Sequence, residues 1–173
     1  KFDQNACTSP HLIAWYGNKN KVSLAKNKFW NSLYEIVKNK YKITNFVAND
    51  KLNELYKLSI ENDKLGKLIS HENMIYRFQF DKVPLNNDKI RGKWGIFFET
   101  ELKSFSKLNN FINEKYQTLT YFGFSKKVLE NLLFKNKFRG IDRIVPVGSS
   151  MNLSLIWDGY DLKNILTRNI EII

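Results

Sequence analysis

The chain has 173 residues, the size of one ordinary domain, and its 43% of hydrophobic residues excludes a disordered chain. Its one cysteine excludes an internal disulfide, and no apolar run reaches the ~20 residues that cross a bilayer, so we expect a soluble cytoplasmic protein without a membrane span. The net charge of +11 fits either a negatively charged partner or a general abundance of lysine, and it selects no function by itself.

Apolar residues at helical spacing alternate along the chain with short strand-like runs. The runs predict strands at 11–17, 73–80, 94–102, 118–124 and 142–148. The helical spacing predicts helices at 27–42, 49–62, 104–116 and 125–134, the last two behind serines that could cap them. The tail is mixed, with a turn at 157–159. Strands separated by helices predict one α/β domain with a mostly parallel sheet.

The common site motifs are absent from the sequence. It contains no G-x-G-x-x-G, no G-x-x-x-x-G-K-[ST] and no G-x-S-x-G pattern. His11 and His71 lack neighbours at metal-ligand spacing, so we expect surface or strand-end residues and no metal site. Basic and aromatic residues interleave, as in "NKFWNSLYEIVKNKYK", but the aromatic residues fall on the expected core face of a helix. We therefore expect no nucleic-acid partner, and a nucleic-acid-binding domain is the weakest hypothesis.

The single cysteine, Cys7, lies in the stretch "DQNACTSPH". The residues Thr8, Ser9 and Pro10 after it suit the first turn of a helix. A helix N-terminus lowers the pKa of a thiol, and its N–H groups can hold an oxyanion formed at an attacked carbonyl. Free cysteine is also among the most buried residue types. The local context therefore leaves two hypotheses open, a nucleophile and a small buried hydrophobic residue.

Two stretches at opposite ends of the chain resemble one known family. "QNACTSPHLIAWYG" resembles the active-site segment of the LuxC-type fatty acyl-CoA reductases, a branch of the aldehyde dehydrogenase superfamily. "GIDRIVPVGSSMNLSLIWDGYDLKNIL" resembles the closing segment of the same family. The resemblance covers this whole chain but only the C-terminal part of such an enzyme. It implies a three-layer αβα catalytic domain of aldehyde-dehydrogenase type over residues 1–173, with the nucleotide-binding domain upstream.

The resemblance also implies a reaction. Cys7 would attack a fatty acyl-CoA or an acyl-protein, its backbone N–H would help to hold the oxyanion, and the acyl-enzyme would take hydride from NADPH and leave as a fatty aldehyde. A detached catalytic domain could be acylated but would not complete the reduction. By analogy with dehydrogenase relatives, this half of the molecule could also pair into a homo-oligomer. The alternative hypothesis is a family relative without catalysis, which binds an acidic acyl carrier protein through its lysines.

The sequence departs from the family where the cofactor is concerned. A glutamate of the wider superfamily contacts the ribose in an E-x-F-G-P context, whereas Glu99 lies in "WGIFFETEL" without the Gly-Pro. Glu99 is either its counterpart or a strand residue, and we favour the strand residue. Arg139 and Arg143 could meet phosphates of CoA or of the cofactor, or form a structural salt bridge. The cofactor-binding residues of this chain are therefore unassigned.

Overall fold

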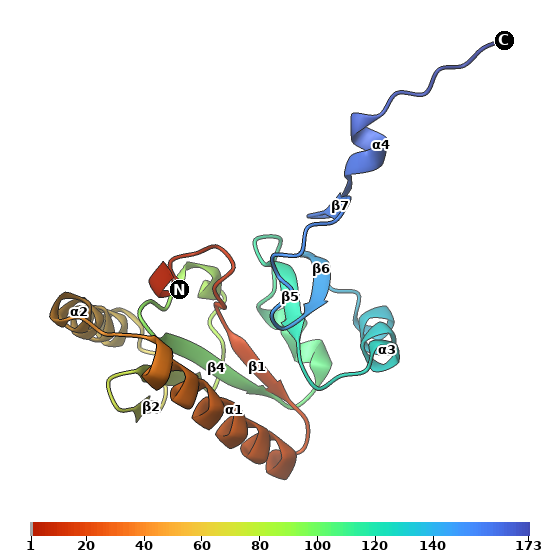
Figure 1. The fold of residues 1–173 in the computed structure, drawn as a ribbon. Helices are drawn as coiled ribbons and strands as arrows, with labels where there is room; N and C mark the ends of the chain where they lie inside the picture. Colours follow the sequence, from red (N-terminus) through yellow and green to blue (C-terminus); the bar gives the residue numbers. More distant parts are fainter. Residues whose placement is uncertain (1) are drawn as a thin grey trace. The chain divides into compact units, whose positions relative to one another are not determined.

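The computed structural model describes residues 2–173, and the chain forms two compact units, residues 1–107 and 108–173 (Figure 1). Both units combine strands with helices, and most of the strand pairs are parallel. The expected α/β class with a mostly parallel sheet is confirmed. Among the residues that the structure describes, no helix has both the length and the apolar character needed to cross a membrane.

The first unit is built on a four-stranded sheet in the order β1-β4-β3-β2. Its strands are β1 (Ile13–Tyr16), β2 (Leu68–His71), β3 (Ile75–Phe80) and β4 (Ile96–Leu102). β4 lies between β1 and β3 and is parallel to both, whereas β2 is an antiparallel edge strand. The strands predicted at 11–17, 73–80 and 94–102 are confirmed with shorter bounds. The sequence analysis does not predict β2, which is too short and too polar to give a clear alternation.

Two helices cover opposite faces of this sheet. They are α1 (Lys19–Lys40) and α2 (Asn45–Glu61). The Trp30 ring of α1 packs edge-on against Phe97 of β4, with 5.2 Å between the ring centroids. Leu58 of α2 belongs to the hydrophobic core cluster that contains Phe98. Because neighbouring residues of a strand point to opposite faces, the contacts of Phe97 and Phe98 place α1 and α2 on different sides of β4.

Both helices begin at a side chain that caps them. The Lys21 backbone N–H donates to Asn18 Oδ1 at 2.9 Å, and the Val47 backbone N–H donates to Thr44 Oγ1 at 3.3 Å. The predicted helices are confirmed, but α1 begins at Lys19 rather than at residue 27. Val22 and Lys26 are the buried residues of this first part, and a buried lysine interrupts the apolar spacing on which the prediction depended.

The second unit contains a two-stranded parallel sheet and a hairpin. Its elements are β5 (Gln117–Tyr121), α3 (Lys126–Asn136), β6 (Ile141–Pro146), β7 (Ile156–Trp157), β8 (Tyr160–Asp161) and α4 (Leu162–Leu166). Ser125 caps α3 as predicted, because its Oγ accepts from the Val128 N–H at 3.4 Å. The turn predicted at 157–159 is confirmed, and Asp158 and Gly159 both have positive φ, as a two-residue hairpin loop requires.

The helix predicted at 104–116 is wrong. The segment forms one 3-10 helix, η3 (Phe105–Asn110), and then irregular chain as far as β5. The Lys107 N–H donates to the Ser104 carbonyl at 3.2 Å, three residues before it, and the Lys115 N–H donates to the Asn113 side chain, at Oδ1, at 3.0 Å. Short polar side chains of this kind compete with the hydrogen bonds of a helical backbone. The apolar spacing of the segment therefore predicts correctly which residues are buried, but it does not predict the backbone conformation.

Candidate functional site

Cys7 lies in a turn between η1 (Phe2–Gln4) and β1. The Ser9 N–H donates to the Ala6 carbonyl at 3.0 Å, which closes the turn around Cys7. No α-helix begins here, so the expected place at a helix N-terminus is wrong. Pro10 gives the physical reason, because proline disfavours the helical conformation of the residue before it. The Cys7 side chain is exposed, so the hypothesis of a small buried hydrophobic residue is also wrong.

Gln4 fastens the segment that carries Cys7 to the loop before β4. Its Nε2 donates to the Ile96 carbonyl at 3.1 Å, and its Oε1 accepts from the Gly95 N–H at 2.5 Å. The Trp94 N–H donates to the Asp3 carbonyl at 3.0 Å. Three hydrogen bonds thus hold the backbone of this segment, and the glutamine of the Gln-x-x-Cys motif supplies two of them.

Cys7 lines an open pocket of about 320 Å³. The lining residues are Gln4, Asn5, Ala6, Cys7, Arg91, Gly92 and Lys93. The thiol therefore shares its pocket with two cations that come from a distant part of the sequence. Only glycine fits at position 92, because a Cβ there would lie 1.9 Å from the Ile96 carbonyl oxygen. The sequence analysis does not identify this loop, and its one signal is a glycine between two cations just before a predicted strand.

Arg91 is hydrogen-bonded to His11, which precedes β1. Arg91 Nη1 donates to His11 Nε2. Burial lowers the pKa of His11, and the charge of Arg91 lowers it further, whereas Asp88 acts in the opposite direction. A guanidinium can only donate, so the His11 ring accepts at Nε2 and carries its proton on Nδ1. His11 is therefore neutral at neutral pH and holds a cation at the edge of the pocket.

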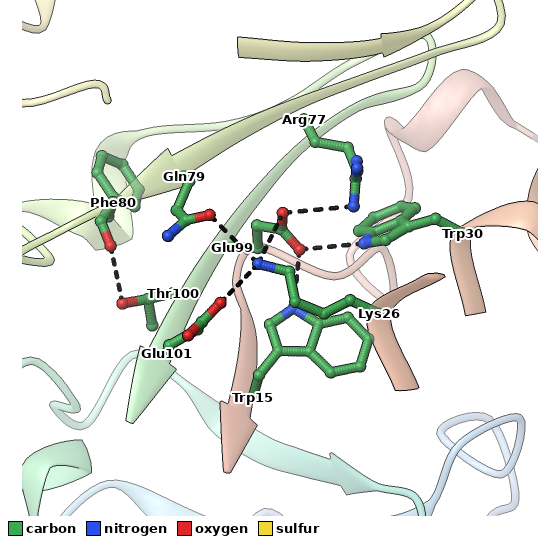
Figure 2. A network of polar contacts seen from close by, with 9 residues as sticks. All are labelled: Trp15, Lys26, Trp30, Arg77, Gln79, Phe80, Glu99, Thr100 and Glu101. Carbon is green, nitrogen blue, oxygen red and sulfur yellow. Dashed lines mark hydrogen bonds and ion pairs between the residues drawn. The ribbon is translucent and has the colours of Figure 1, made fainter. Parts of the chain in front are cut away.

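Glu99 lies in β4 and is fully buried. The indole N–H groups of Trp15 and Trp30 donate to its Oε2 at 2.8 Å and 3.0 Å (Figure 2). Lys26 Nζ lies 3.4 Å and Arg77 Nη1 lies 3.5 Å from its Oε1. We call Glu99 and these four partners the Glu99 cluster. Both carboxylate oxygens are occupied within the chain, which fits the interpretation of Glu99 as a strand residue and leaves no place for a ribose hydroxyl.

Arg143 is also engaged within the chain. Its Nη1 donates to the Ser150 carbonyl at 2.6 Å, and its Nη2 donates to the carbonyls of Ser149, at 3.4 Å, and of Asn152. The guanidinium carbon lies 4.5 Å from the centre of the Trp157 ring. Arg143 therefore fixes a loop of the second unit through backbone carbonyls, whereas the sequence analysis left a phosphate contact and a salt bridge open. Arg139 is exposed.

The remaining candidates for metal or cofactor contacts are His71, Glu99, Arg139 and Arg143. Within residues 2–173, no three side chains of His, Cys, Asp or Glu come together to hold a metal ion. His71 lies at the end of β2, where its ring is 5.9 Å from that of Tyr34. Glu99 and Arg143 make other contacts within the chain, whereas Arg139 is exposed. The cofactor-binding residues of this chain therefore stay unassigned.

Comparison with known proteins adds no identification. No protein-family model matches the chain, and a search of the curated proteins finds no match. What the structure brings together is the Cys7 thiol, Arg91 and Lys93 around one pocket. The thiol is exposed, so an electrophile that enters this pocket can reach it.

Proposed function

We propose that this chain is the cysteine-bearing catalytic portion of a LuxC-like reductase that converts fatty acyl thioesters to aldehydes. The observation that carries the proposal is the exposed Cys7 thiol in a pocket, on a segment that Gln4 fixes to the loop before β4. The two motif resemblances supply the substrate class, a fatty acyl-CoA or an acyl-protein. In this proposal residues 1–173 are the C-terminal domain of a cytoplasmic enzyme of aldehyde-dehydrogenase type. The helices on opposite faces of β4 support such a layered domain.

The step proposed for this chain is acyl transfer. The Cys7 thiolate attacks the thioester carbonyl, a bond forms between Cys7 Sγ and the carbonyl carbon, and the bond to the donor sulfur breaks. The donor leaves as a thiolate and takes up a proton from water. Exchange of one thioester for another changes the bonding little, so a cysteine is a suitable acceptor. The Cys7 backbone N–H would donate to the oxyanion that forms in between.

Reduction of the acyl group would require NADPH, which supplies a hydride when it is bound. No described residue is assigned to that cofactor, so the proposal assigns only acyl transfer to this chain. The nucleotide-binding site would belong to another domain of the same enzyme. We therefore expect the chain to accumulate the acyl-enzyme rather than to release an aldehyde.

The proposal is tested by intact-mass measurement after incubation with palmitoyl-CoA. We expect one palmitoyl adduct on the wild-type chain and none on the Cys7→Ala variant. The comparison is clean because Cys7 is the only cysteine of the sequence. A wild-type chain that gains no adduct, although its thiol reacts with iodoacetamide, would contradict acyl transfer. That result would favour the alternative, a protein that binds an acidic acyl carrier protein whether or not Cys7 is present.

A further inference from the structure

We propose that Arg91, held in place by His11, binds an oxyanion of the acyl donor beside the Cys7 thiol. The inference rests on the proposed acyl transfer at Cys7 and adds a substrate property to it. The donor would carry a carboxylate or a phosphate that reaches the pocket while Cys7 attacks the carbonyl carbon, and the phosphates of CoA are groups of this kind. Neither sequence motif identifies this property, because Arg91 lies outside both of them.

The contacts of the two pocket cations favour Arg91 over Lys93 as the group that binds a negatively charged ligand. Lys93 has an acidic neighbour, because its Nζ lies 4.0 Å from Glu54 Oε2. The same ammonium lies 5.5 Å from the centre of the Trp94 ring. Arg91 instead donates to a neutral imidazole, which holds the guanidinium without adding a negative charge, and Asp88 is the acidic residue whose charge reaches this pair. Arg91 is therefore the better placed of the two cations to meet a negatively charged ligand.

The arginine side chain suits this role. A guanidinium presents five N–H donors in a planar fork that matches a carboxylate or a phosphate. The hydrogen bond to His11 Nε2 uses one of them. The oxyanion would meet this fork from the pocket side, where Arg91 and Cys7 both line the wall.

The position of Arg91 is fixed from two directions. Its backbone neighbour Gly92 lies so close to the Ile96 carbonyl that no side chain fits there. Its side chain is held by His11, which is half-buried on the segment that leads from Cys7 to β1. The charged group that faces this pair is Asp88, on η2 (Asn87–Lys89), and its charge reaches the His11 ring. His11 is thus a positioning residue, and a binding group that is fixed in advance loses little entropy when the ligand arrives.

The test compares two alkylating reagents that differ in charge. Iodoacetate carries a carboxylate where neutral iodoacetamide carries an amide, one bond from the carbon that the thiolate attacks, and both react with the single thiol. The ratio of their rate constants cancels any shared change in thiolate fraction or access. We expect Arg91→Gln to lower the iodoacetate-to-iodoacetamide ratio by about three- to tenfold, the effect of one unit charge at a few ångströms near water. Lys89→Gln, an exposed cation outside the pocket, should leave the ratio within about twofold.

The role of His11 is tested by the same ratio. We expect His11→Ala to lower it towards the Arg91→Gln value, and His11→Gln to retain it, because the glutamine Oε1 can accept the same hydrogen bond. The double variant His11→Ala with Arg91→Gln should match Arg91→Gln alone, since the two residues act through one group. A ratio that Arg91→Gln leaves unchanged would overturn the oxyanion site. A ratio that falls with Arg91→Gln but not with His11→Ala would overturn the positioning role.

The alkylation test of the oxyanion site can be told apart from the adduct test of the proposed acyl transfer. Alkylation requires neither CoA nor a thioester, so it reports on the pocket alone. If the palmitoyl adduct forms but Arg91→Gln leaves the ratio unchanged, the inference is overturned and acyl transfer stands. If the ratio falls as expected but no adduct forms, acyl transfer is overturned while the oxyanion site beside Cys7 stands. Arg91 is exposed, so its replacement should leave folding intact, and a urea unfolding curve checks this.

Discussion

The Glu99 cluster and the Cys7 pocket both involve β4 or the loop before it. Charged groups are buried and compensate one another in the cluster, whereas they face water in the pocket. In the Glu99 cluster, solvent is excluded and the carboxylate meets two indole N–H groups and two cations. In the Cys7 pocket, the thiol is exposed and the guanidinium of Arg91, which lines the same pocket, is hydrogen-bonded to a neutral ring. The first arrangement leaves nothing for a ligand to satisfy, whereas the second leaves a charge and a nucleophile facing water.

Within the first unit, the residues that contribute to folding stability therefore differ from the residues that are available for a reaction. Two buried cations and a buried carboxylate are costly to desolvate, and they are tolerated only when they compensate one another. Groups that line an open pocket stay hydrated and have no such desolvation cost. They are available for a reaction but contribute little to the free energy of unfolding. We therefore expect substitutions in the Glu99 cluster to change the free energy of unfolding, and substitutions around Cys7 to change reactivity.

The largest effect is expected from Glu99→Leu. This substitution removes the carboxylate and leaves Lys26, Arg77 and two indole N–H groups without their shared acceptor. We expect the free energy of unfolding to fall by about 3–5 kcal/mol, measured by urea titration with tryptophan fluorescence. The matched control is Glu101→Gln, whose side chain is 44% exposed and which also meets Lys26. It should cost less than about 1 kcal/mol, and equal losses in the two variants would contradict the distinction.

A smaller and local effect is expected from Gln4→Leu, on the pocket side of the comparison. The substitution removes the two hydrogen bonds that fasten the Cys7 segment to the loop before β4. We expect the free energy of unfolding to fall by about 1–2 kcal/mol. The Gly95 amide, which donates to Gln4 Oε1, should lose most of its protection from hydrogen exchange. Asn5→Ala serves as the control, and unchanged exchange at Gly95 in Gln4→Leu would contradict the proposed fastening.

The smallest effect is expected from His71 as the pH falls. Burial lowers the pKa of His71, and Arg77 lowers it further, whereas Glu99 acts in the opposite direction. Below about pH 6.5 the unfolded chain therefore binds more protons at this residue than the folded chain, so stability falls as the pH drops towards the folded-state pKa. His71→Phe should lose less stability than wild type between about pH 7.5 and about pH 5.5 in urea titrations. The same slope in both proteins would contradict this contribution.

Local patterns in the sequence predict most of the secondary structure but little of the site. Alternation of apolar residues locates β3 and β4, and a capping serine locates α3. The helix predicted at 104–116 fails because most backbone hydrogen bonds of this segment span three residues rather than four, and because the Asn113 side chain accepts from the Lys115 N–H. The prediction misses the start of α1 because Lys26 faces the interior, where it pairs with a glutamate on a strand distant in the sequence. Periodicity cannot identify a buried residue whose charge is compensated from elsewhere in the chain.

Contacts between residues that are far apart in the sequence also form the site, and local patterns do not reveal them. The sequence identifies Cys7 as a candidate, and its exposure keeps that hypothesis open. It does not identify Arg91 or the role of His11, because the hydrogen bond between them joins residues that are far apart in the sequence. Glu99 is recognised as a strand residue, but its tryptophan partners are not, since an indole N–H shows no preference for a partner until the tertiary structure forms.

The Glu99 cluster also bears on how the first unit folds. Its members come from β1, α1, β3 and β4, so no local segment can assemble it alone. A partly formed cluster would hold a desolvated charge without its counter-charge, which raises the free energy of any intermediate that buries only some of these elements. The parallel pairing of β4 with β1 and β3 likewise joins distant parts of the chain. The cluster thus makes the formation of this unit cooperative, with its central strand among the last regions to open.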